Sequence, residues 1–453
     1  MAWRRFDTFM GGIVLPEDKR ATRGGIVAAA PVPHKLLVPL DACGLGEATS
    51  EVAAGQVIRA GERIGQAGGR LPVFSPLDGI VWGPATVELA GEGPAPTKCP
   101  AVEILPSAGD GPAAPLGAGT DAVPAAAIDD PEIILERIAA AGLVTHSRPV
   151  TPLADWIAAA RTAGADTLIA NGLENEPYLT GDHRLLVEHG REVVEGLVLV
   201  ARAIGAGRTA LAVDVHHSGD YHHAAQRAEE LGVEPLAIEP KYPTGHPVML
   251  TRVVTRRTVR PGGRPLDIRV GVIDVPTCLA VSRCMTSGSP TMHRVVTLAG
   301  RGVAAPGNYL VPLGTPVAEL LTLGGVDPSA AGLIWCGGPM TGTRLEGEAV
   351  IGPATSAVLA LPPSGEQPAG VCIRCGWCTD QCPVRLNVAD LNDQYELGQV
   401  ARAARHDAQA CIGCGVCSYV CPASIPLTAR MWRLKAAARM LEPVSARRES
   451  GGG

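Results

Sequence analysis

The spacing of hydrophobic and polar positions changes several times along the chain, and each change predicts a different kind of element. Between about residues 6 and 105, short apolar runs such as KLLVPL and PVFSPLDGIVWG are separated by turns, which is typical of a small β module. From residue 131, amphipathic helical stretches such as PEIILERIAAAG alternate with buried runs such as DTLIANG and TALAVDV. This alternation indicates βαβ units and a parallel sheet.

The pattern changes twice more toward the end of the chain. Short apolar strands return between about residues 266 and 361, with glycine-rich turns at GRGVAAPGNY and CGGPMTG. After residue 368, a polar helical segment separates two groups of cysteines. Because 453 residues exceed the size at which one hydrophobic core keeps growing, we expect a multidomain protein of α/β and β units.

The first β module has a recognisable turn pattern. Gly55 and Gly61 frame a turn that is followed by FSPLDGIV, and this arrangement resembles the barrel-sandwich hybrid of lipoyl- and biotin-carrying domains. The expected hairpin tip holds Leu77, Asp78 and Gly79 instead of a lysine. A structural or docking module is therefore the preferred interpretation, since no residue is present to carry a swinging arm.

Charge and hydropathy exclude several classes of partner. The net charge is −6 and no basic block occurs, which argues against binding of nucleic acid. The first residues lack the apolar run of a signal peptide, and no later stretch has the length of a spanning helix. We expect a cytoplasmic location, at most peripheral on the inner face of the cell membrane through partner subunits.

The cysteines carry the clearest chemical signal. Eight of the 13 lie between residues 372 and 421, where the pattern CxxCxxCxxxCP occurs twice. This is the spacing of bacterial proteins with two [4Fe-4S] clusters, in which the fourth cysteine of each run binds the other cluster. The predicted ligands are Cys372, Cys375, Cys378 and Cys421 for cluster 1, and Cys411, Cys414, Cys417 and Cys382 for cluster 2. A pair of zinc sites is the alternative, because CxxC pairs also bind zinc.

The remaining five cysteines are scattered, and most are expected to be buried small side chains. Cys278 and Cys284 are the two with an alternative role, as a redox pair.

Longer motifs extend the comparison to nearly the whole chain. They are FDTFMGGIVLPEDK, NGLENEPYLTGDHRLL, KYPTGHP, VTLAGRGVAAPGNYLVPLGTPVAELL, IWCGGPMTG and the two cysteine segments. The chain resembles the RnfC family, the C subunit of the Rnf ion-translocating ferredoxin:NAD oxidoreductase complex. The resemblance implies FMN and NADH beside two [4Fe-4S] clusters. It also implies other electron-transfer subunits, a ferredoxin or a flavoprotein, as partners.

The family architecture then gives the expected domains. They are a barrel-sandwich hybrid at 1–105, a linker at 106–128, a Rossmann-like FMN/NADH-type domain at 129–285, a β-grasp (SLBB-like) module at 286–362, an α-rich dicluster ferredoxin-like domain at 363–436, and a disordered tail at 437–453.

The resemblance breaks at the loop that should bind FMN and NADH. Family members have a glycine-rich loop there, whereas this chain reads THSRPVT, with Ser147, Arg148, Pro149 and Val150 in place of the glycines. Glycines let the backbone approach the cofactor and present N–H groups to phosphate, and Pro149 removes one such donor. Arg148 is the residue expected to supply a phosphate contact instead.

The acidic motif of the flavin domain is retained. Glu174, Glu176 and Tyr178 follow a predicted strand, where ligands bind in open α/β sheets, so we expect them in the pocket. The alternative is that the two carboxylates cap the following helix.

A second polar loop, VDVHHSGDYHH, contains His216, His217, Asp220, His222 and His223. A solvated loop is its preferred interpretation and a transition-metal site the alternative, because adjacent histidines point apart on a regular backbone.

Two functions follow from these observations. The first is an electron-transfer oxidoreductase subunit that carries electrons between a flavin/nicotinamide donor and a partner protein. The second is a non-catalytic iron-sulfur wiring subunit that has lost FMN and NADH binding and links a separate flavoprotein to a terminal reductase. The altered loop is the main support for the second function.

Overall fold

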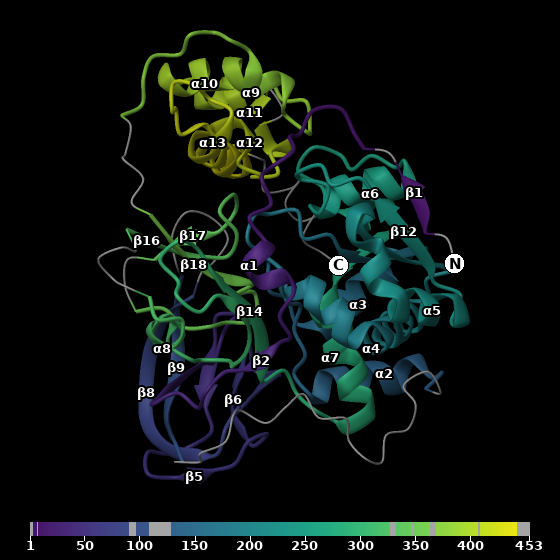
Figure 1. Ribbon diagram of the computed structural model, residues 1–453, viewed down its shortest axis with the longest axis vertical. Coiled ribbons are helices and arrows are strands. Elements are labelled where there is room, and N and C mark those ends of the chain that lie inside the picture. The colour runs from purple at the N-terminus through teal and green to yellow at the C-terminus, as the bar shows by residue number, and fades with distance from the viewer. Residues whose placement is uncertain are drawn as a thin grey trace.

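The computed structural model describes residues 3–6, 8–89, 97–107, 128–326, 332–345, 348–362, 368–405 and 408–441. Four β sheets and a separate helical unit form the expected succession of domains (Figure 1). Most of the predicted linker, 106–128, lies outside the described residues.

The N-terminal β module consists of two antiparallel sheets packed face to face. One sheet has the strand order β3-β9-β8-β5 and the other β4-β6-β7. The strands are β3 (Leu36–Pro39), β4 (Ala48–Ser50), β5 (Val57–Ile58), β6 (Arg63–Ala67), β7 (Leu71–Phe74), β8 (Gly79–Leu89) and β9 (Thr97–Pro106). Between the sheets lie alternate aliphatic side chains, among them Leu36, Ile64 and Ile104, as expected for strands with one buried face.

The second domain is built on a five-stranded parallel sheet with the order β1-β12-β11-β10-β13. Its strands are β1 (Arg4–Phe6), β10 (Thr167–Gly172), β11 (Arg208–Asp214), β12 (Glu234–Ile238) and β13 (Val270–Asp274). The covering helices are α2 (Pro131–Ala140), α3 (Leu153–Thr162), α4 (Gly181–Ile204), α5 (His222–Glu230), α6 (Pro247–Thr255) and α7 (Val275–Ser287). Short 3₁₀ turns lie at Val215–Tyr221 and Pro265–Ile268. Five of the six residues of β10 are buried, which is typical of a central strand in a parallel sheet.

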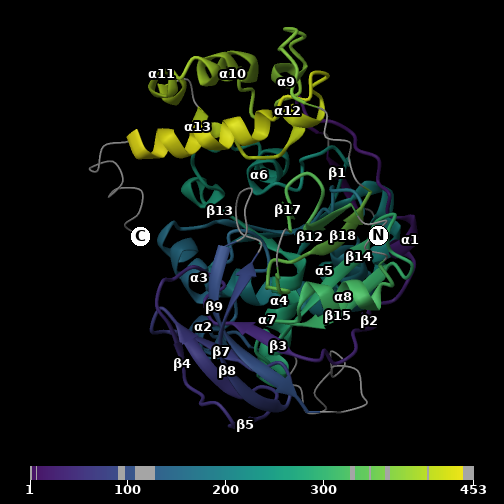
Figure 2. The ribbon, with the colours of Figure 1, turned by 90° about the vertical axis from the view of Figure 1, so that its left-hand side faces the viewer.

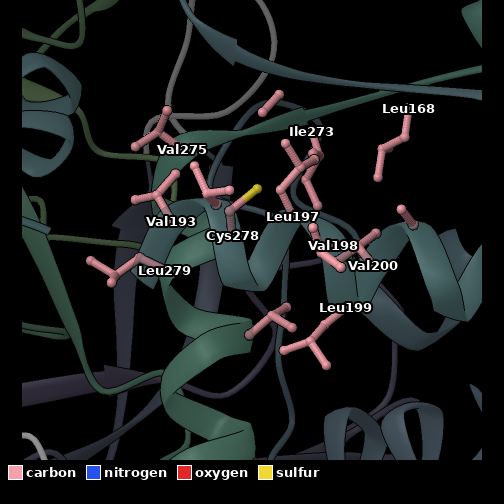
Figure 3. Close-up of a cluster of buried hydrophobic side chains, with 14 of the residues drawn as sticks. Leu168, Val193, Leu197, Val198, Leu199, Val200, Ile273, Val275, Cys278 and Leu279 are labelled. Carbon is pink, nitrogen blue, oxygen red and sulfur yellow. The ribbon is translucent and has the colours of Figure 1, made fainter. Parts of the chain in front are cut away.

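The core of this domain depends on close packing of α4 against α7 (Figure 3). A Cβ atom on Gly196 would lie 1.8 Å from the carbonyl oxygen of Cys278, so only glycine fits there. Cys278 and Cys284 are both buried as free thiols, and burial raises the pKa of Cys284 to about 12. The two side chains therefore serve as core residues, as the preferred interpretation holds, and not as a redox pair.

The third unit is a six-stranded mixed sheet with the order β17-β16-β18-β14-β15-β2. It comprises β2 (Ala28–Ala29), β14 (His293–Ala299), β15 (Gly307–Pro312), β16 (Leu333–Cys336), β17 (Thr343–Arg344), β18 (Ala357–Leu361) and helix α8 (Val317–Leu323). This corresponds to the expected β-grasp module, with one strand supplied from the start of the chain.

The helical C-terminal unit contains an internal repeat, because its two cysteine loops share one backbone conformation. Its helices are α9 (Trp377–Asp380), α10 (Val388–Glu396), α11 (Val400–Arg405), α12 (Val416–Tyr419) and α13 (Leu427–Leu441), with a 3₁₀ turn at Ala408–Ala410. The left-handed φ angles of Arg374 (60°) and Gly376 (81°) recur at Gly413 (68°) and Gly415 (82°). In Figure 2 the unit lies above the other domains, and α13 faces them. Helix α13 ends at Leu441, so the predicted disordered tail begins inside a helix, and its remainder lies outside the described residues.

The start of the chain contributes strands to sheets of two other domains. Residues 8–30, which we call the N-terminal strap, lie outside the barrel-sandwich module and include α1 (Arg20–Arg23) (Figure 1). Strand β1 before the strap pairs with β12 of the parallel sheet, and β2 within it pairs with β15. The first residues of the predicted domain 1–105 thus complete two other sheets, and the domain bounds stay a prediction.

None of the helices in the described ranges has both the length and the apolar character needed to cross a bilayer.

Candidate functional site

The structure gathers the eight clustered cysteines into two sets, each around a small hollow. One hollow is lined by Cys372, Cys375, Cys378 and Cys421, and the other by Cys382, Cys411, Cys414 and Cys417. The fourth cysteine of each run thus lies beside the first three of the other run. These are the two sets that the spacing predicts for cluster 1 and cluster 2.

The surroundings of the second set fit a thiolate-bound cluster. Backbone N–H groups of Leu386 and Gly413 each point at a cysteine sulfur, at 3.4 Å from Cys382 and Cys411 respectively. Burial raises the pKa of the Cys417 thiol to about 12, so thiolates here need a positive metal centre to offset desolvation. Hydrogen bonds to sulfur and exclusion of water are the means by which a protein tunes cluster potential.

A much larger cavity, of about 830 Å³, lies where three of the units meet. Its walls come from the carboxyl ends of β10 and β13, the loop Gly337–Gly342 after β16, and the cluster 2 loop Ile412–Gly415. Ligands bind at the carboxyl ends of strands in open α/β sheets, and cavities of 300–1,000 Å³ are usual for cofactors.

Several polar atoms on the wall of this cavity are buried without a hydrogen-bond partner. They are Asn175 Nδ2, Asp274 Oδ2, and Arg294 Nε and Nη1. Asn175 and Asp274 are held in place by their Oδ1 atoms, which accept hydrogen bonds from Gly245 N at 2.7 Å and Thr277 N at 2.8 Å respectively. Positioned polar groups that lack partners are expected where a ligand completes the hydrogen bonding. A flavin, with a flat ring edged by donors and acceptors, fits this wall.

The loop THSRPVT, which stands in place of the expected glycine-rich loop, uses backbone N–H groups in hydrogen bonds within the loop and to Thr277. Thr145 N donates to Thr151 O at 2.9 Å, Thr151 N to Thr145 Oγ1 at 3.0 Å, and His146 N to Thr277 Oγ1 at 2.9 Å. These N–H groups are therefore not available to a phosphate. Arg148 of the same loop lines the 830 Å³ cavity, and its contact with a cofactor phosphate stays a prediction.

The two predicted carboxylates have separate structural roles. Glu174 accepts hydrogen bonds from Asp182 N (3.0 Å) and His183 N (2.8 Å), so it caps α4, as the alternative interpretation holds. Glu176 accepts from Met340 N (2.8 Å) and from the Thr341 hydroxyl, and thereby fixes the loop over the cavity. Both carboxylates line the cavity, and their part in cofactor binding stays a prediction.

Tyr178 lies elsewhere. Its ring packs beside the hydrophobic cluster that includes Leu179 and Leu359, and its backbone N–H donates to Glu17 O at 2.9 Å. The cavity is lined instead by Asp182, Asp274 and Arg294, which the sequence did not indicate as site residues. Burial raises the pKa of Asp182 to about 8, with the charge of Glu174 as a further cause. Asp274 is the last residue of β13. The rule that ligands bind at the carboxyl ends of parallel strands would therefore have identified it as a site residue from the sequence.

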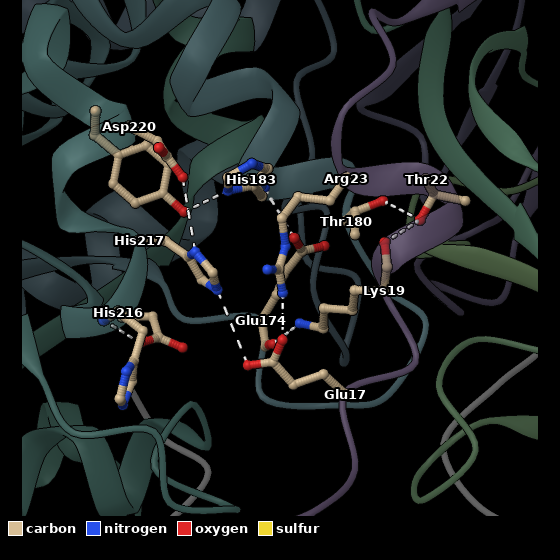
Figure 4. Close-up of polar contacts among 12 residues, drawn as sticks. Glu17, Lys19, Thr22, Arg23, Glu174, Thr180, His183, His216, His217 and Asp220 are labelled. Atoms are coloured by element: carbon tan, nitrogen blue, oxygen red, sulfur yellow. Dashed lines mark hydrogen bonds and ion pairs between the residues drawn. The ribbon is translucent and has the colours of Figure 1, made fainter.

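The histidine loop brings only part of its side chains together (Figure 4). Ligand atoms of His217, Asp214 and Glu17 lie within 4.8 Å of one another. However, Glu17 pairs with Arg23, and the Lys19 ammonium lies beside it on the carbonyl of Glu174. Two cations this close oppose binding of a third, so the solvated loop remains the preferred interpretation.

Residues that line the 830 Å³ cavity also contact the backbone of the cluster 2 loop directly. The Tyr242 hydroxyl donates to the carbonyl of Cys414 at 2.6 Å, and a Cβ atom on Gly415 would lie 2.8 Å from Met340 O. The strap adds a third contact, because Gly12 N donates to Gln381 O at 2.8 Å, next to Cys382. Tyr242 belongs to the KYPTGHP motif, and these contacts give that motif a physical role.

Four family models match the chain in the order of its domains. They are the RnfC barrel sandwich hybrid domain (7–104), the Nuo51 FMN-binding domain (138–283), the SLBB domain (295–344) and the 4Fe-4S dicluster domain (368–425). The predicted fold class is confirmed. The predicted cofactor classes, [4Fe-4S] clusters and a flavin, are confirmed as those of the matched domains.

Relatives with known names are similar to this chain along most of its length. The C subunit of the ion-translocating oxidoreductase complex of Yersinia pseudotuberculosis serotype O:3 (strain YPIII) is 32% identical over 97% of this chain and 63% of its own length. The protein of the same name from Yersinia pestis bv. Antiqua (strain Antiqua) is 32% identical over 97% of this chain and 70% of its own length. The chain thus spans less than two thirds of the length of the first relative.

Among solved structures, the NAD+-reducing [NiFe]-hydrogenase in the H2-reduced state has a chain that matches with a TM-score of 0.48 and 19% identity. That match covers 73% of this chain and 68% of the hydrogenase chain. The relatives and the family models together confirm the predicted resemblance. The chain belongs to the RnfC family, the C subunits of ion-translocating oxidoreductase complexes.

Proposed function

We propose that this protein is an electron-transfer subunit that passes electrons between a flavin in the 830 Å³ cavity and a partner protein, through two [4Fe-4S] clusters. The observation that carries the proposal is that the loop of cluster 2, Ile412–Gly415, forms part of the cavity wall. In this arrangement cluster 2 is the first acceptor from the cavity and cluster 1 the second. The two sets of four cysteines described above are the proposed ligands.

The residues of this chain have defined tasks in the proposed function. A flavin, when bound, converts two-electron chemistry with a nicotinamide into the one-electron steps that clusters carry. Glu176 holds the Gly337–Gly342 loop over the cavity, which limits entry of water. Asn175 and Asp274 present unpartnered polar atoms for orientation of the ring. Tyr242 fixes the backbone of Cys414 relative to the cavity.

None of the four cysteines proposed for cluster 1 lines the 830 Å³ cavity. Cys375 is exposed, and so are the apolar side chains of Val371 (87%), Ile373 (67%) and Trp377 (56%). An exposed apolar patch next to a redox centre is suited to transient docking of another electron-transfer protein. The proposed partner is a further redox subunit, a ferredoxin or a flavoprotein. A membrane-bound subunit as partner would place this chain at the inner face of the cell membrane.

One measurement tests the proposal. The chain is purified anaerobically, its clusters are reconstituted, and the visible spectrum is recorded before and after NADH is added. Bound FMN together with bleaching of the cluster absorbance by NADH is the expected result. Full cluster iron with neither flavin nor bleaching would contradict it and would indicate the wiring subunit instead. Zinc in place of iron would contradict both functions.

A further inference from the structure

A second, smaller cavity lies between the parallel-sheet domain and the β-grasp module. Its volume is about 240 Å³, and its walls come from α7, from Leu185 of α4, and from residues 289–295 at the start of β14. His146 and Arg294 line both this cavity and the 830 Å³ cavity, so the two share a wall.

The smaller cavity is lined by cationic side chains whose polar atoms lack partners. Arg283 pairs with Glu192 through Nε at 3.1 Å, but its Nη1 and Nη2 are buried without a hydrogen bond. Arg294 is only 4% exposed, and its Nε and Nη1 have no partner. His293 Nε2 and Thr291 Oγ1 on the same wall are also buried and unpartnered.

Burial of guanidinium N–H groups without partners is costly, because each loses its hydration without compensation. Burial lowers the pKa of Arg283, and burial followed by the charge of Arg283 lowers the pKa of His293 to about 4. Burial is the largest cause of both shifts, and none of the residues that line this cavity is acidic. Water would satisfy the hydrogen bonds but would add no negative charge to a lining that holds two guanidinium groups. An anion with several acceptor oxygens satisfies both requirements.

We propose that Arg283 and Arg294 form a binding site for an oxyanion of phosphoryl type in the 240 Å³ cavity. Guanidinium forks match the oxygen spacing of phosphate, and Thr291 adds a hydroxyl donor. His293, which is uncharged near neutral pH, adds an N–H donor in the tautomer that protonates Nε2.

Two sources supply this chemistry. One is the phosphate of a flavin mononucleotide whose ring lies in the adjoining cavity, a source that rests on the proposed function above. This source also explains how a phosphate is held although the N–H groups of Thr145, His146 and Thr151 are already engaged. The other source is free inorganic phosphate, which does not depend on flavin binding.

The first experiment measures thermal unfolding of the full chain with and without inorganic phosphate, at an ionic strength matched with chloride. Wild-type protein is expected to show a rise in Tm of several degrees with phosphate. The variants Arg283→Gln and Arg294→Gln are expected to lose this rise. Arg59→Gln, on an exposed loop of the barrel-sandwich module, is the matched control and should keep it.

The baseline without phosphate provides an independent readout. In chloride, both variants should keep the cluster absorbance of wild type, which shows that they fold, and only the rise in Tm on addition of phosphate is compared between the proteins. A variant that merely fails to fold would show a lower Tm and lost cluster absorbance. A phosphate response that is absent in wild type, or equal in wild type and both variants, would overturn the proposal.

The second experiment compares the affinities of FMN and riboflavin. If the flavin phosphate is the oxyanion, wild type should bind FMN about 10- to 100-fold more tightly than riboflavin, and Arg294→Gln should reduce this ratio toward one. Equal affinities combined with a phosphate response assign the site to free phosphate. A phosphate response without any flavin binding supports the oxyanion site while the proposed function fails. Flavin binding without a phosphate response or an FMN preference overturns only the oxyanion site.

Discussion

Glu176 provides the sharpest test of how the large cavity is closed. Its carboxylate accepts from Met340 N at 2.8 Å and from the Thr341 hydroxyl, so one side chain after β10 holds the loop Gly337–Gly342. Hydrogen bonds to a charged group contribute about 1.5–3 kcal/mol each. Burial of Glu176 raises its pKa, which shows that part of this gain is offset by desolvation. We therefore expect Glu176→Ala to lower the free energy of opening this loop by about 2–3 kcal/mol.

Hydrogen exchange measures this opening directly. A change of 2–3 kcal/mol corresponds to roughly 30- to 150-fold faster exchange of the Met340 amide, with little change for amides in β10. Glu132→Ala, on the exposed surface of α2, is the control and should leave both regions unchanged. Unaltered exchange at residues 337–342 in the Glu176→Ala protein would refute the role that we assign to this carboxylate.

Three further predictions concern the clusters, the cavity and the core. Cys421→Ser should remove cluster 1 and Cys382→Ser cluster 2, so each variant should retain about four irons with a different remaining EPR signal; loss of the same cluster in both would contradict the crossed ligand sets. Asp182 has a folded-state pKa of about 8 against an ordinary value of 3.8, so wild-type stability should fall as pH rises between these values, by at most about 1.4 kcal/mol per pH unit. Asp182→Asn should therefore raise Tm at pH 8 but not near pH 4, and an equal effect at both would exclude the shift. Gly196→Ala should destabilise the protein by about 2 kcal/mol or more in urea unfolding, because the new methyl group meets the carbonyl of Cys278 at 1.8 Å; an unchanged midpoint would contradict that packing.

The sequence predicted the features that depend on local spacing. The duplicated cysteine pattern predicts which four cysteines belong to each cluster, and the structure brings together the same two sets. Alternation of helices and buried strands likewise predicted the parallel sheet.

The site residues that the sequence did not indicate are those brought in by tertiary packing. Arg294 belongs to a strand of the β-grasp module. Its position on the wall of the 830 Å³ cavity depends on how this module packs against the parallel-sheet domain. Tyr178 was expected in the pocket because it is near Glu176 in sequence, but its φ of 70° turns the chain away from the cavity. Neither effect follows from spacing along the chain.

The N-terminal strap also determines when the molecule can finish folding. Gly12 leaves the ribosome early, but its hydrogen-bond partner Gln381 is made 369 residues later, which is roughly 20–75 s at 5–20 residues per second. Strand β1 must likewise wait for β12, and β2 for β15. During synthesis the start of the chain therefore has unpaired strand edges, and its docking is the step that locks the dicluster unit onto the finished sheets.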